Sequence, residues 1–290
     1  MTTDVLAARG IRPGVPLAAE WQLALPLLLV FVSTFLAALV LLACISAAVD
    51  NDLTSFGPDQ YIRFASDPFH WRIALNTVLL GLKTVAFTTV MAYPLALLYL
   101  EIGPRARRLL VFAILLPLLT GTVVRTFAWV VILGSEGLVN TTIAALGLNP
   151  VRLLHTEFGL VLSLSQIELP IMLLPLLSVM HRIDRNLIDA SMSLGAGYWR
   201  TLRRVILPLS LPGLIAGAIL VFASAVTSYF SQTIIGGARL VYLTKLIYEQ
   251  AMIVFNWPFA AAIAMVLMVS VLSVIALLAW LGRRAPNAYG

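Results

Sequence analysis

The sequence predicts an all-α membrane protein with six transmembrane helices. Of its 290 residues, 61% are hydrophobic and only 11% are charged, and the mean hydropathy is +0.99. A soluble globule of this length needs far more charged residues to cover its surface. The chain also contains apolar runs that are long enough to cross a hydrocarbon core of about 30 Å.

The apolar runs set the expected order of the spans. The six expected spans are 23–49, 74–100, 109–133, 158–180, 209–235 and 259–281. The first run is longer than the core of a secretory signal, so we interpret it as a span although it resembles a lipoprotein processing site at Cys44. Turn-forming residues fill 134–156, where we expect a short surface helix. These boundaries predict an N-terminal segment at 1–22, a transmembrane domain at 23–282 and a tail at 283–290.

Positively charged residues indicate how the spans are oriented. Twelve of them lie on the side of the termini, at positions 9, 12, 105, 107, 108, 182, 185, 200, 203, 204, 283 and 284. The opposite loops hold five, at positions 63, 72, 152, 239 and 245. An excess of Lys and Arg marks cytoplasmic loops, so both termini are expected to be cytoplasmic. The net charge of +6 therefore serves membrane orientation, and no nucleic-acid partner is expected.

The connection at 184–208 is amphipathic and carries several arginines, unlike the apolar runs on both sides. Leu187, Ala190 and Leu194 recur at the spacing of one helix face. Gly195 follows, and glycine readily takes the left-handed conformation that ends a helix. A second apolar-periodic run then extends to Leu207-Pro208, where proline is expected to stop it. We expect two short helices joined by a glycine elbow on the cytoplasmic surface.

This connection resembles the signature loop of inner-membrane permease subunits of binding-protein-dependent ABC importers. In that family the loop reads Glu-Ala-Ala, three residues, Gly, nine residues, Ile, any residue, Leu-Pro. The matching positions here are Asp189, Ala190, Ser191, Gly195, Val205, Leu207 and Pro208. Asp, Ser and Val replace Glu, Ala and Ile, and the spacing is intact. In the family this loop docks into a groove on the cytoplasmic ATPase subunit.

Beyond the loop, most of the chain is similar to the spermidine/putrescine importer permeases. The segments that carry this similarity are 124–129, 137–140, 169–170 with 174–175, 236–239 and 256–261. These segments are also similar to those of relatives that handle iron, phosphonates or opines. The resemblance implies a type I importer permease fold in a bacterial inner membrane. It also implies partners: a homologous second permease, two ATPase subunits and a periplasmic binding protein.

Motifs for chemistry within the chain itself are missing from the sequence. Neither lysine, Lys83 or Lys245, follows the glycine pattern of a phosphate-binding loop. The single cysteine and three scattered histidines give no metal-ligand spacing. We therefore expect no enzyme activity and no cofactor or metal in this chain, with ATP and magnesium bound by the partner subunits.

Four costly polar residues lie inside the expected spans: Lys83, Arg125, Gln166 and Glu168. Glu168 is our main candidate for touching a cationic solute, because Pro170 is expected to break the helix beside it and open it to a cavity. The alternative is a structural ion pair with Lys83 or Arg125. Lys83 is expected to extend toward a surface, and Arg125 to hold neighbouring carbonyl groups.

Aromatic residues and glycines complete the expected transport region. Tyr229 and Trp257 are expected near the outer ends of spans, where aromatic rings favour organic cations, although an interface belt also explains Trp257. Gln166 and Arg125 join them as candidate solute-pathway residues. Gly213 and Gly217 form a small-xxx-small pair that predicts close helix packing.

Two other function classes remain as alternatives. An ion-driven secondary carrier would transport without ATP, and the chain lacks the several buried acids expected of an ion relay. A non-transporting scaffold would leave the buried Lys83, Arg125 and Glu168 without a purpose.

Overall fold

The computed structural model describes residues 17–284, and this part of the chain is helical apart from connecting loops and one isolated bridge between Ala48 and Phe56. Residues 1–16, with Arg9 and Arg12, and residues 285–290 make up most of the expected N-terminal segment 1–22 and tail 283–290, and they lie outside the described residues. The long helices are α2 (Leu17–Ser46), α4 (Pro68–Glu101), α8 (Glu157–Met180), α11 (Leu207–Thr227) and α14 (Trp257–Arg284). The shorter ones are α3 (Asp59–Ser66), α5 (Pro104–Leu115), η1 (Leu116–Leu119), α6 (Thr122–Leu133), α7 (Leu138–Ala145), α9 (Arg185–Ser193), α10 (Tyr198–Thr201), η2 (Leu202–Ile206), α12 (Tyr229–Ile234), α13 (Leu243–Tyr248) and η3 (Glu249–Ile253).

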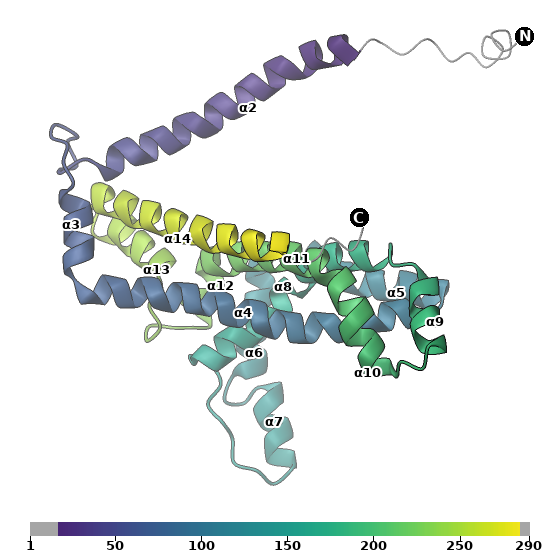
Figure 1. Ribbon diagram of the computed structural model, residues 1–290. Coiled ribbons are helices and arrows are strands. Elements are labelled where there is room, and N and C mark those ends of the chain that lie inside the picture. The colour runs from purple at the N-terminus through teal and green to yellow at the C-terminus, as the bar shows by residue number, and fades with distance from the viewer. Residues whose placement is uncertain (1–16, 285–290) are drawn as a thin grey trace, which may run out of the picture.

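Four long helices, α4, α8, α11 and α14, run alongside one another as a bundle (Figure 1). Helices α9 and α10 lie at one end of the bundle, and α3 lies across the other end (Figure 1). Helix α2 leans away from the bundle on one side, and α7 projects from it on the opposite side (Figure 1). The connection at 184–208 is therefore separated from the α3 end by the length of the bundle.

Helix α8 is the centre of the packing. Leu160, Leu164, Met172, Leu173 and Leu176 on this helix are fully buried, between α4 and α11. Burial on several sides explains why its sequence reads as a continuous apolar run rather than as one apolar stripe.

The close packing expected of Gly213 and Gly217 is confirmed. A Cβ atom at Gly213 would lie 2.9 Å from the carbonyl oxygen of Pro175 on α8. One at Gly217 would lie 2.9 Å from the carbonyl oxygen of Met172. The two glycines therefore let the backbones of α11 and α8 approach each other more closely than any side chain permits.

Six apolar helical stretches in the described residues are long enough to cross a membrane, as the sequence predicts. The expected third span, 109–133, is not one helix. It is divided into α5, η1 and α6, because Pro117 and Gly121 interrupt the backbone hydrogen bonds between them. The long apolar stretch in this region is Thr122–Ala145, which includes α7 as well as α6.

The expected fifth span, 209–235, ends earlier than predicted. Helix α11 stops at Thr227, and Ser228 has a non-helical ψ of 67°. At the break, the N–H of Ser228 donates to the carbonyl of Ala225 at 3.4 Å, and the buried side-chain amide of Gln232 donates to the carbonyls of Ala225 and Val226 at 3.0 Å each. Gln232 also accepts a hydrogen bond from Thr244. The side chain of Gln232 thus stabilises the break, and Tyr229 belongs to the separate helix α12.

The expected surface helix in 134–156 is present as α7. One buried side chain, Asn140, holds this projecting segment together. Its amide nitrogen donates to the carbonyl of Gly134 at 3.0 Å, and its oxygen accepts from the N–H of Val151 at 2.9 Å. Asn140 thereby joins both ends of the segment to α7.

Replacing Asn140 with alanine is expected to loosen this segment without unfolding the bundle. The change leaves a buried N–H and a carbonyl unpaired, at a cost of about 1–3 kcal/mol. Hydrogen exchange of residues 134–156 should become faster, whereas exchange in α8 should not change. Asn149→Ala, at an exposed position in the same segment, is the matched control. Equal exchange in both variants would contradict the role of Asn140.

Candidate functional site

The predicted glycine elbow is present between α9 and α10. The side chain of Asp184 accepts a hydrogen bond from the N–H of Asn186 and so caps the start of α9. At its end, Gly195 has φ +79°, its N–H bonds to the carbonyl of Met192, and the N–H of Ala196 bonds to that of Ser191. These paired bonds and the left-handed residue form a Schellman motif, which favours glycine at this position. The spacing of Gly195 in the sequence is explained by this turn.

The second half of the connection differs from the prediction. Leu207-Pro208 does not stop a helix, because α10, η2 and α11 follow one another as a single helical stretch from Tyr198 to Thr227. The segment η2 is a π-helix in which the N–H of Leu207 bonds to the carbonyl of Leu202. This wider turn precedes Pro208, which has no N–H and crowds the turn before it. The elbow therefore continues into α11 without a break.

The elbow is also attached to the end of α4. Arg185 on α9 donates a hydrogen bond to the carbonyl of Leu100, and Arg107 donates to the same carbonyl at 3.0 Å. Arginines at this position satisfy the last carbonyl groups of α4 and complement the negative end of its dipole. The hydroxyls of Ser191 and Thr201 lie 3.0 Å apart and join the two halves of the elbow.

Apolar side chains at the tip of the elbow face outward. Leu194 is 88% exposed and Trp199 is 72% exposed. Leu194 lies outside the six apolar stretches, so its exposed side chain is available to a partner protein rather than to lipid. The candidate coupling residues Asp189, Ala190 and Gly195 are exposed in the same connection, whereas Leu207 and Pro208 are half-buried at the start of α11. The exposed part of the signature loop is therefore the elbow itself.

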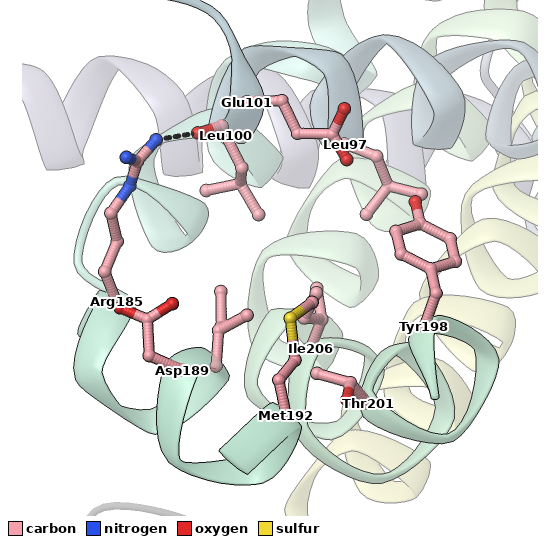
Figure 2. Close-up of a pocket in the computed structure, with 10 residues that line it drawn as sticks. Leu97, Leu100, Glu101, Arg185, Asp189, Met192, Tyr198, Thr201 and Ile206 are labelled. Atoms are coloured by element: carbon pink, nitrogen blue, oxygen red, sulfur yellow. Dashed lines mark hydrogen bonds between the residues drawn. The ribbon is translucent and has the colours of Figure 1, made fainter. Parts of the chain in front are cut away.

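A hollow of about 310 Å³ lies between the elbow and the end of α4 (Figure 2). Its wall on α4 comes from Leu97, Leu100 and Glu101. The wall on the elbow and the start of α11 comes from Arg185, Ile188, Asp189, Met192, Tyr198, Thr201 and Ile206. No pattern in the sequence predicts that Glu101 and Tyr198 share a site.

Glu168 is placed differently from the expectation. Helix α8 is continuous through Pro170, and Glu168 is only 3% exposed. One carboxylate oxygen accepts a hydrogen bond of 2.8 Å from Ser224 on α11, and the other has no partner among the described residues. The neighbouring helices α4 and α11 cover α8 on two sides, so the proline does not open the helix to a cavity.

Arg125 and Gln166 are brought together around a cavity of about 400 Å³ in the transmembrane region. Pro117, Ala128, Trp129 and Ile132 complete its lining. The indole N–H of Trp129 donates to the side-chain oxygen of Gln166 at 3.0 Å. Arg125 donates to the carbonyl of Ile167 at 2.9 Å, which confirms the expectation that it holds a neighbouring carbonyl. Neither Tyr229 nor Trp257 lines this cavity.

Lys83 pairs with Glu157 at the start of α8, at 2.5 Å, and both side chains are half-exposed. The alternative pair of Lys83 with Glu168 is therefore wrong. The expectation that Lys83 extends toward a surface is confirmed, because its partner lies at the end of a span rather than inside it.

The two aromatic candidates occupy separate places. The ring of Tyr229 lies 4.8 Å from that of Tyr248, between centroids. Trp257 begins α14 and is exposed, and its backbone N–H donates to the side-chain oxygen of Asn51. Trp129 was missed as a site residue, although it follows Arg125 by four positions and so lies on the same helix face.

The family described as the inner membrane component of binding-protein-dependent transport systems matches residues 14–286. The chain belongs to this family. It is a permease subunit of an ABC importer, and this function accounts for the six apolar stretches in the described residues.

Its relatives include polyamine permeases. The chain is 33% identical to the spermidine/putrescine transport system permease protein PotB of Haemophilus influenzae, over 68% of this chain and 70% of that protein. It is 30% identical to PotB of Escherichia coli K12, over 80% of this chain and 84% of that protein. The putative 2-aminoethylphosphonate permease protein PhnU of Salmonella typhimurium is 30% identical over 49% of this chain and 50% of that protein.

The fold of the permease is shared with a solved bacterial transporter that imports the acidic polysaccharide alginate. The two chains superpose with a TM-score of 0.74 at 18% sequence identity, over 94% of this chain and all of that one. At this identity the similarity concerns the fold alone.

Proposed function

We propose that this permease subunit imports a polyamine such as spermidine or putrescine. Similarity to the PotB proteins over most of the chain is the observation that carries this proposal. The complete transporter would contain a homologous second permease, two ATPase subunits and a periplasmic binding protein that delivers the solute. We place it in the bacterial inner membrane with both termini cytoplasmic, as the distribution of arginines favours.

The elbow at 184–208 supplies the proposed contact with the ATPase. Its tip exposes Leu194 and Trp199 to a partner, and Gly195 fixes the turn between its two helices. Movement of the ATPase subunits would shift the elbow and, through the continuous helix from Tyr198, the far end of α11. The solute pathway would then open alternately to each side of the membrane. ATP and magnesium would be bound by the ATPase subunits.

Within the membrane, Glu168 and the cavity of Arg125 form the proposed solute pathway. Arg125 alone would repel a cationic solute, so a nearby carboxylate is needed to offset its charge. Glu168 meets this need because it directly follows Ile167, whose carbonyl accepts the hydrogen bond from Arg125. Gln166 and Trp129 offer a polar group and an aromatic face beside Arg125. Tyr229 and Trp257 remain proposed contacts near the ends of spans.

Replacing Glu168 with glutamine is expected to slow polyamine uptake about tenfold, since the pathway then carries an unbalanced positive charge at Arg125. Uptake would be measured in vesicles that contain the complete transporter and its binding protein. The control is Glu136→Gln, which removes the same charge at an exposed position of the 134–156 segment. If Glu168→Gln transports as fast as this control, the carboxylate does not act on the solute.

A second candidate solute is a small anionic compound such as 2-aminoethylphosphonate. The guanidinium group of Arg125 in the cavity lining favours this alternative, because arginine binds phosphonate-type oxygens well. Direct binding of labelled spermidine and of labelled 2-aminoethylphosphonate to the binding protein separates the two. Binding of the phosphonate, with no binding of spermidine, would replace the polyamine proposal.

A further inference from the structure

The hollow between the elbow and the end of α4 has the features of a binding site that the transport pathway does not use. Its volume, about 310 Å³, is in the range of pockets for small organic molecules. Leu97, Leu100, Ile188, Met192 and Ile206 give it an apolar lining. It lies at the end of the bundle occupied by α9 and α10 (Figure 1), and it shares no lining residue with the cavity of Arg125.

The polar groups around this hollow favour a cation. The side chains of Glu101 and Asp189 lie on different sides of it (Figure 2), and neither carboxylate has a hydrogen-bond or ion-pair partner among the described residues. The ring of Tyr198 forms another part of the wall, and an aromatic ring attracts organic cations. The one cationic group in the lining, Arg185, is already bound to the carbonyl of Leu100.

We infer that this hollow binds an α,ω-diamine from the cytoplasm. The hydrocarbon chain of such a molecule would lie on the apolar lining, and its two ammonium groups would reach Glu101 on one side and Asp189 on the other. A monoamine could satisfy only one carboxylate, and a diol could satisfy neither charge. The arrangement therefore selects molecules with a positive charge at each end.

Occupation of the hollow would affect transport because its walls belong to two parts that the proposed mechanism moves. Glu101 ends α4, whereas Asp189 and Tyr198 belong to the elbow. A ligand that bridges them binds best when the walls have the present spacing, and it shifts the population toward that arrangement. The inference rests on the proposed function in this respect, and it predicts that cytoplasmic diamine slows the transporter. The imported solute, if it is a polyamine, would then limit its own uptake.

The test measures ATP hydrolysis by the assembled membrane complex of permeases and ATPase subunits, without the binding protein. The probe is 1,4-diaminobutane, compared with butylamine and 1,4-butanediol. We expect half-inhibition on the order of 1 mM diamine, as for a site with two exposed charges, and no effect of the other two compounds at that concentration.

Two variants locate the effect. Glu101→Gln should raise the diamine concentration for half-inhibition at least about threefold, and Leu97→Phe should raise it further by filling the hollow. Glu136→Gln, far from the elbow, should respond like the parent protein. The inference is overturned if the diamine has no effect, if butylamine acts equally well, or if both pocket variants respond like the parent.

This assay needs no transported solute, so it separates the inference from the proposed function. Inhibition that depends on Glu101, in a transporter that fails to import polyamines, would leave the site in place and refute only the polyamine proposal. Polyamine uptake that cytoplasmic diamine does not inhibit would refute the inferred site and leave the polyamine proposal in place.

Discussion

Replacing Gly195 with valine is expected to uncouple ATP hydrolysis from solute uptake. Gly195 has φ +79°, a conformation that a β-branched residue adopts only with a strain of about 1–2 kcal/mol. No atom lies within 4 Å of the position of a Cβ, so the effect comes from the backbone and not from a collision. The turn between α9 and α10 would open, and the tip would no longer fit its partner. Binding-protein-dependent uptake in vesicles should fall at least about tenfold while the ATPase subunits still hydrolyse ATP.

Gly197→Val is the matched control for this experiment. Gly197 also has open space around it, but its φ of −68° suits any residue. It should therefore retain most of the uptake. If the two variants transport equally well, the left-handed turn is not needed for coupling, and the proposed role of the elbow fails.

Replacing Gly217 with valine is expected to prevent stable packing of the bundle. The new Cβ would lie 2.9 Å from the carbonyl oxygen and 3.2 Å from the Cα of Met172, and backbone atoms cannot move aside as a flexible side chain does. Helices α11 and α8 would have to separate along their shared face, at a cost of about 3 kcal/mol. The yield of monodisperse permease and its temperature of thermal aggregation should both drop.

Ala216→Val tests whether added volume alone explains the effect. Ala216 neighbours Gly217 on α11, but it is exposed. This variant should therefore behave like the parent protein in both measurements. Equal loss in both variants would show that α11 tolerates no enlargement, whereas no loss in either would show that the close approach at Gly217 is dispensable.

Much of the architecture is predictable from the sequence because hydrophobic runs and turn chemistry act locally. The length of α8, the helix α7 and the glycine turn at Gly195 all follow from patterns within a few residues. The predicted helix breaks at proline were wrong where the surrounding structure compensates for the proline. Helix α8 continues through Pro170 between its neighbours, and the π-turn of η2 accommodates Pro208.

The polar sites depend on contacts between distant segments, which periodicity does not reveal. Ser224 reaches Glu168 across a helix interface, and Glu157 reaches Lys83 from the start of another helix. The break after Thr227 was not predicted either, although the amide of Gln232, which donates to the carbonyls of Ala225 and Val226, lies only six and seven residues from them. Trp129 could have been found from its spacing to Arg125, whereas no local signal joins Glu101 to the elbow.

The helix that follows the elbow acts mechanically as a lever arm. Its longest part, α11, has 21 residues and spans about 32 Å at 1.5 Å per residue, and α10 meets it at an angle (Figure 1). A tilt of about 5° around one end would therefore displace the other end of α11 by about 3 Å, close to the diameter of a water molecule. The wide π-turn of η2 at one end of α11 and the hydrogen-bonded joint at Ser228 at the other end mark the two places where such a rod can pivot. A small stroke on the elbow would then be amplified into a movement large enough to admit or exclude a solute.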